Sequence, residues 1–168
     1  MATASVQRIA GGDLGAQQTL QRMRDVVNHS LRDPVIIETA RGIAAQAPPR
    51  DLLGIVRAIY DYLQDHFQFV PDPRGVETLA TPRYLLDRIE RHSFAEGDCD
   101  DAAILAAALG KAVGLRAKYR AVGFAAPNGP LTHVYTLLHA GGRWVRLDPT
   151  KPLSRPIPPA ARAYEVAV

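Results

Sequence analysis

Three side chains in the sequence have the types needed for nucleophilic catalysis on a carbonyl group: Cys99, which is the only cysteine, His133 and Asp148. A thiol becomes a strong nucleophile when a base takes its proton, and an imidazole serves as that base when a carboxylate orients it. Taken singly, each residue has an ordinary structural explanation: a small buried cysteine, a hydrogen-bonded strand histidine and a strand-ending turn. Their combination favours a Cys-His-Asp triad, which requires that the three meet in the folded chain.

Cys99 is predicted to lie in the first turn of a helix. Asp98 is a suitable N-cap, and the unpaired backbone N–H groups at a helix start stabilise both a thiolate and an oxyanion on an attacked carbonyl. Gly97 is expected to let another chain or a substrate backbone approach closely. Asp100 and Asp101 would raise the pKa of the thiol if they pointed toward it. We expect them to face away, as solvated carboxylates that cap the helix.

The residues that follow predict three antiparallel strands and the turn that brings His133 near Asp148. The strands cover residues 115–124, 132–139 and 143–148, where apolar residues alternate or β-formers gather. Gly141-Gly142 forms a tight hairpin turn between the last two strands. The register of this hairpin places His133 opposite residue 150, two positions from Asp148. The imidazole and the carboxylate are therefore predicted to be neighbours on adjacent strands.

Helices are predicted for most of the chain before these strands. Their patterns cover residues 13–31, 34–44, 51–66, 82–91 and 99–113. The last of them is apolar on nearly all sides and should be buried, with Gly114 as its C-terminal cap. Residues 67–75 are expected to be connecting structure. The four prolines between residues 152 and 159 predict an extended tail that does not pair in a sheet.

The overall composition describes one globular domain. The chain has 168 residues, 47% of them hydrophobic, with one cysteine and a net charge of +3. These values exclude a disordered chain and a disulfide-stabilised miniprotein. Residues 1–15 contain no apolar run long enough for a signal peptide or a membrane span, so we expect a cytoplasmic protein, or one carried in a virus particle. The charge excess is spread along the chain, and neither a nucleic-acid nor a membrane partner is expected.

No metal and no cofactor are predicted. His133 and His139 share one face of a strand, but about 20 Å separates them, which is too far for shared metal ligation. The acidic residues around Cys99 lack the alternating ligands, central glycine and terminal glutamate of a calcium loop.

Four segments of the sequence form a characteristic set. They are Gly97–Asp101, Gly114–Ala117, His133–Tyr135 and Trp144–Thr150. Together they resemble the transglutaminase-like superfamily, whose members have the papain-like fold. The resemblance implies that Cys99 is the nucleophile, His133 the general base and acid, and Asp148 the residue that orients the imidazole. It also implies an α+β fold, in which N-terminal helices and a buried helix carrying Cys99 pack on a small antiparallel sheet.

This resemblance also suggests how the single domain is organised. Residues 1–49 are expected to be an N-terminal helical extension, residues 50–150 the core and residues 151–168 a proline-rich tail. Residues 69–73 and 77–82 further resemble a small single-domain branch that occurs in phages and prophages.

The expected activity is hydrolysis of, or acyl transfer from, a peptide or protein amide through a thioester intermediate. Hydrolysis is favoured because a small domain has no evident means of excluding water from the acyl-enzyme. The alternative is a structural or assembly protein of a phage or prophage that keeps the fold, with catalysis secondary or absent and other phage proteins as partners. Nucleic-acid binding through scattered arginines is a third hypothesis.

Overall fold

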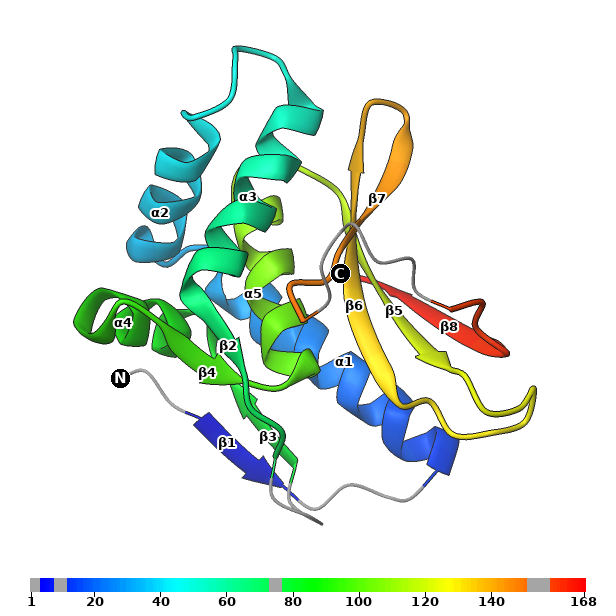
Figure 1. The fold of residues 1–168 in the computed structure, drawn as a ribbon. Helices are drawn as coiled ribbons and strands as arrows, with labels where there is room; N and C mark the ends of the chain where they lie inside the picture. The colour runs from blue at the N-terminus through cyan, green and yellow to red at the C-terminus, as the bar shows by residue number, and fades with distance from the viewer. Residues whose placement is uncertain (1–3, 8–11, 73–76, 151–157) are drawn as a thin grey trace.

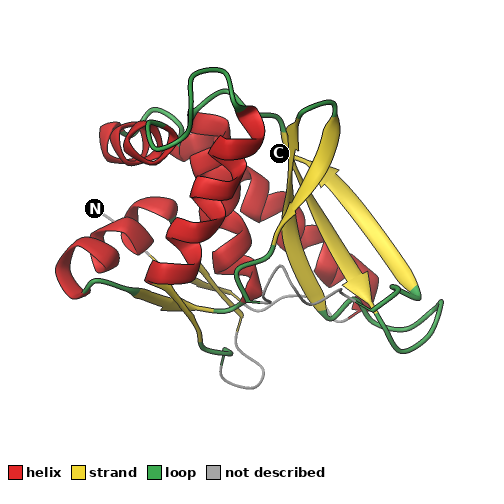
Figure 2. Ribbon diagram, turned by 45° about the horizontal axis from the view of Figure 1, so that its top comes forward, coloured by secondary structure: helices red, strands yellow, loops and turns green. Residues whose placement is uncertain are grey.

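The computed structural model describes residues 4–7, 12–72, 77–150 and 158–168, which form two layers (Figure 1). Helices make up one layer and a four-stranded sheet the other, as Figure 2 shows from a second direction. The helices are α1 (Gly12–Ser30), α2 (Pro34–Ala44), α3 (Leu52–His66), α4 (Pro82–His92) and α5 (Cys99–Ala112). The α+β class predicted from the sequence is confirmed.

The main sheet is antiparallel throughout and has the strand order β7-β6-β5-β8. Its strands are β5 (Ala117–Gly123), β6 (His133–Ala140), β7 (Arg143–Leu147) and β8 (Arg162–Ala167). Four shorter strands form two further pairs, one antiparallel and one parallel. These are β1 (Ala4–Gln7) with β3 (Glu77–Ala80), and β2 (Phe67–Phe69) with β4 (Ala95–Gly97).

Helix α5 is the central element of the fold, and the prediction that it is buried is confirmed. Every residue from Asp100 to Gly110 is buried, and the helix contacts α1, α2 and α3 as well as β6 (Figure 1). A Cβ atom at Gly110 would lie 2.5 Å from a methyl group of Leu138, so glycine lets β6 approach the helix closely. Because the position of α5 is fixed from several sides, so is the position of Cys99 at its first turn. None of the described helices is long and apolar enough to cross a bilayer.

Capping side chains fix the starts of four helices where the sequence predicts them. Asp33, Asp51, Thr81 and Asp98 each accept a hydrogen bond from a backbone N–H in the first turn of α2, α3, α4 and α5, respectively. Such caps stabilise a helix by about 0.5–2 kcal/mol each. Helix α1 begins at Gly12, so Asp13, where the sequence pattern predicts the helix to begin, lies in its first turn.

The prediction that the C-terminal tail pairs with no strand is wrong. Residues 162–167 form β8, which pairs with β5 along its whole length. The prolines of the tail all precede this segment, so they remove no amide donor from it. Tyr164 and Val166 alternate with exposed residues and pack against the main core. This packing stabilises the strand, and the number of prolines in the tail gave no indication of it.

Residues 67–69, expected to be connecting structure, form β2 and run parallel to β4. No strand is predicted for β4. Each of these strands has only three residues, too few for an alternating hydrophobic pattern to be recognised.

Candidate active site

Cys99 is the first residue of α5, and Asp98 caps the helix as predicted. The Asp98 carboxylate accepts hydrogen bonds from the backbone N–H groups of Asp100, at 2.9 Å, and Asp101, at 3.5 Å. The N–H groups at a helix start have no acceptor within the helix. The amide of Cys99 can therefore donate to an oxyanion that forms on a carbonyl attacked by its own thiol.

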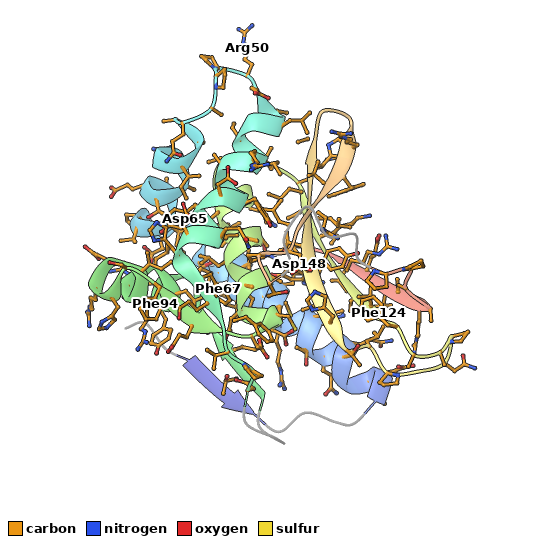
Figure 3. The ribbon with its side chains drawn as sticks, viewed as in Figure 1. Arg50, Asp65, Phe67, Phe94, Phe124 and Asp148 are labelled. Carbon is orange, nitrogen blue, oxygen red and sulfur yellow. The ribbon has the colours of Figure 1, made fainter. Side chains whose placement is uncertain are left out.

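The β6–β7 hairpin brings His133 and Asp148 together. Its register is the one predicted from the Gly141-Gly142 turn, with Ala140 paired to Arg143. Asp148 follows β7 directly, and its Oδ2 lies 2.8 Å from His133 Nε2. Figure 3 shows Asp148 where the sheet meets the helical layer. The imidazole and the carboxylate are thus neighbours, as the position of the turn implies.

The carboxylate of Asp148 is held on both oxygens and is only 1% exposed. While Oδ2 contacts His133, Oδ1 accepts a hydrogen bond from Thr150 Oγ1 at 2.6 Å. The side chain of Gln64, from α3, donates to the Pro149 carbonyl and ties this turn to the helical layer. Neither Thr150 nor Gln64 is predicted from the sequence. The Asp-x-Thr spacing is a local signal for the first contact, whereas the second joins residues 85 positions apart.

The thiol of Cys99 lies against the start of β6. The backbone N–H of Val134, the residue next to His133, faces the sulfur and lowers the pKa of the thiol. Because Nε2 of His133 contacts Asp148, Nδ1 is the ring nitrogen left to receive a proton. The first turn of α5, the start of β6 and the turn after β7 therefore lie at one junction, with Cys99 beside Val134 and His133 beside Asp148.

The prediction that Asp100 and Asp101 are solvated is wrong for both residues, and the prediction that they face away from the thiol is wrong for Asp100. They are 7% and 4% exposed, and the Cys99 thiol donates to Asp100 Oδ1 across a distance of 3.6 Å. Burial raises the pKa of the thiol far above its usual value, and the negative charges of Asp100 and Asp98 raise it further. The amide of Val134 opposes them by lowering that pKa. Asp98 alone fills the capping role, so the two following carboxylates turn into the interior as the helix begins.

Asp101 ties the start of α5 to the end of β3. Its Oδ1 accepts a hydrogen bond from the backbone N–H of Ala80 at 2.7 Å. A Cβ atom at Gly97 would lie 2.5 Å from Asp101 Oδ2. Within the described residues, the group that approaches Gly97 closely is therefore this buried carboxylate. The close approach of another chain or a substrate backbone stays a prediction.

The carboxyl of Asp101 predicts a pH dependence of stability. Burial raises its pKa from 3.8 to about 7, against the lowering effect of the Ala80 amide. The folded state then binds a proton that the unfolded state has lost, so the contribution of this carboxyl to stability is fully present below about pH 4 and is lost as the pH rises through about 7. Asp101→Asn, which keeps the acceptor oxygen and cannot ionise, is expected to remove this fall, whose slope reaches at most about 1.4 kcal/mol per pH unit. Urea denaturation of both proteins across this range measures the difference; parallel curves would contradict the assignment.

Asp98, Cys99 and Asp100 each bring one potential ligand atom within 4.8 Å of the other two. The set joins a soft thiol to two hard carboxylates, which suit different metals. Asp98 also accepts two backbone amides and Asp100 accepts the thiol. We assign no metal to these residues. His139 lies elsewhere, with its ring 5.2 Å from that of Trp144 in an edge-to-face contact.

Comparisons with known proteins identify the family and the fold of the chain. The family model of the transglutaminase-like superfamily matches residues 37–149. A search of curated proteins finds no match. Two solved structures share the fold. One is a proposed cysteine protease from Cytophaga hutchinsonii, which matches 69% of this chain with a TM-score of 0.52 and 19% sequence identity. The other is a proposed protease from Parabacteroides distasonis ATCC 8503, which matches 89% of this chain with a TM-score of 0.60 and 15% sequence identity. This chain spans 37% and 28% of their respective lengths. The family match covers more than half of the chain and includes the three residues of the site, so the chain belongs to the transglutaminase-like superfamily.

Proposed function

We propose that the protein is a cysteine hydrolase or acyl transferase that acts on peptide or protein amides through a thioester on Cys99. One observation carries the proposal: the imidazole of His133 is 2.8 Å from the buried Asp148, and the amide of the next residue contacts the Cys99 sulfur. Membership of the superfamily supports the same class of chemistry.

In the proposed reaction, the Cys99 sulfur attacks the amide carbonyl carbon while its proton passes to Nδ1 of His133. The electrons of the C=O double bond move to the oxygen, which the Cys99 backbone N–H at the start of α5 can stabilise. Collapse of this intermediate breaks the C–N bond, and the imidazolium returns the proton to the leaving amine. Asp148 stabilises the imidazolium and fixes the ring, so that Nδ1 serves as the base.

Water resolves the thioester in hydrolysis, and an amine resolves it in acyl transfer. We propose hydrolysis, because a domain of this size has no evident means of excluding water from the acyl-enzyme. No observation in the described part of the structure favours the phage assembly role, which stays a prediction from the sequence, as does a cytoplasmic or virion location.

The acyl-enzyme itself provides the test. The protein is mixed with p-nitrophenyl acetate, quenched in acid and digested, and the peptide that carries the acetyl group is identified by mass spectrometry. We expect an acetyl thioester on the peptide containing Cys99, which disappears as the probe is consumed. Absence of the adduct, or equal labelling of the urea-unfolded protein, would exclude an activated thiol.

A further inference from the structure

We propose that Asp100 is a positioning residue that holds the Cys99 thiol protonated in the resting protein, so that His133 takes the proton only during attack on a bound carbonyl. The inference rests on the proposed function and adds a resting state to it. It concerns a side chain that the three-residue mechanism does not use.

The contact between the two side chains is direct and largely shielded from water. Asp100 Oδ1 lies 3.6 Å from the Cys99 sulfur, in the geometry of an S–H donating to a carboxylate. Asp100 is 7% exposed. A charge that is removed from water acts strongly on its neighbours, because little solvent screens it. The S–H bond is thus directed at Asp100 in the resting state, and the carboxylate disfavours a second negative charge on the sulfur.

The groups around the sulfur act on it in opposite directions. The carboxylates of Asp100, in the first turn of α5, and of Asp98, its N-cap, both disfavour the thiolate. From β6, the Val134 amide favours it, and His133 is the base that faces this junction. On β5, Tyr119 is fully buried. Burial raises the pKa of its hydroxyl, and the charge of Asp100 raises it further. The two carboxylates and burial together outweigh the single amide.

This balance distinguishes the protein from one that keeps a preformed thiolate–imidazolium pair. Here the thiol proton leaves the Asp100 hydrogen bond and moves to Nδ1 of His133 as the carbon–sulfur bond forms. Negative charge then develops on the carbonyl oxygen and not on an isolated sulfur. A neutral resting thiol also reacts slowly with electrophiles other than the bound substrate, since the thiolate is the reactive form.

The test is the pH profile of Cys99 alkylation by iodoacetamide. Asp100→Asn removes the charge and is expected to move the midpoint down by at least one unit, which raises the rate near neutral pH by about tenfold. Asp100→Ser is a second neutral variant with the same expected shift. It replaces Asp100→Asn if the protein with that substitution does not fold. Asp100→Glu, which keeps the charge, should remain near the wild-type profile. The matched control is Asp25→Asn, because Asp25 is an exposed acid on α1 and its replacement should leave the profile unchanged.

Repeating the measurement in a His133→Ala background separates this inference from the proposed function. If Asp100 acts on the thiol itself, the downward shift persists without the imidazole. An unchanged midpoint in both neutral variants overturns the inference, even if the acetyl-enzyme forms on Cys99. A shift without any acetyl-enzyme supports the role of Asp100 and overturns the proposed function.

Discussion

Replacement of Cys99 by alanine is expected to lower acyl transfer by about 10⁴-fold or more, which for p-nitrophenyl acetate means a fall to the uncatalysed rate. The sulfur is the only protein atom in the proposed mechanism that forms a bond to the carbonyl carbon of the substrate. Without it, His133 and Asp148 retain their 2.8 Å contact but have no proton to transfer. Release of nitrophenolate, followed by absorbance and corrected for buffer hydrolysis, measures the loss.

A matched variant separates chemistry from folding. Cys99→Ser keeps the size and the hydrogen-bonding capacity of the side chain, but an alcohol is a far weaker nucleophile at neutral pH. We expect it to be as inactive as Cys99→Ala and to unfold at nearly the same urea concentration as the wild type. Residual turnover within tenfold of the wild type in a correctly folded Cys99→Ala protein would place the reaction at another residue.

Asp148→Asn is expected to lower kcat by about 10²–10⁴-fold with a much smaller change in KM. Asp148 Oδ2 accepts from Nε2 of His133, and this keeps Nδ1 unprotonated and able to act as the base. An asparagine amide can instead donate to Nε2, which favours the tautomer whose Nδ1 already carries a proton. The carboxylate is buried, so neither water nor a surface charge can replace it.

Thr150 offers the control for this prediction, because it contacts the other oxygen of the same carboxylate at 2.6 Å. Thr150→Val removes that hydrogen bond and keeps the shape of the side chain. We expect a loss of about tenfold in kcat, and recovery of wild-type activity in Thr150→Ser. Equal activity of Asp148→Asn and the wild type would show that the carboxylate does not orient the base.

Much of the site could be predicted from the sequence because its determinants are local. A capping aspartate before an apolar segment predicts the start of α5, and hence Cys99 in the first turn. A Gly-Gly turn between two alternating segments sets the register of β6 and β7, and that register brings His133 to Asp148. In both cases, residues within a few positions of one another decide the result.

The directions of Asp100 and Asp101 could not be predicted in the same way. A run of acids at a helix start is usually solvated, and the sequence pattern does not distinguish the capping residue from the carboxylates that follow it. Their burial depends on β3 and β6, which supply Ala80 and Val134 next to the first turn of α5. These partners are about 20 to 35 positions away in the chain, so no local pattern contains them.

The amino-acid sequence by itself therefore determined the starts of four helices, the hairpin and the three candidate catalytic side chains, since caps and tight turns depend on neighbouring residues. Only the tertiary structure decided that β8 completes the sheet, that Gln64 holds the turn after Asp148, and that a second carboxylate faces the thiol. Each of these depends on how α5 packs between the other helices and the sheet, because burial and charge proximity are properties of elements brought together from distant parts of the chain.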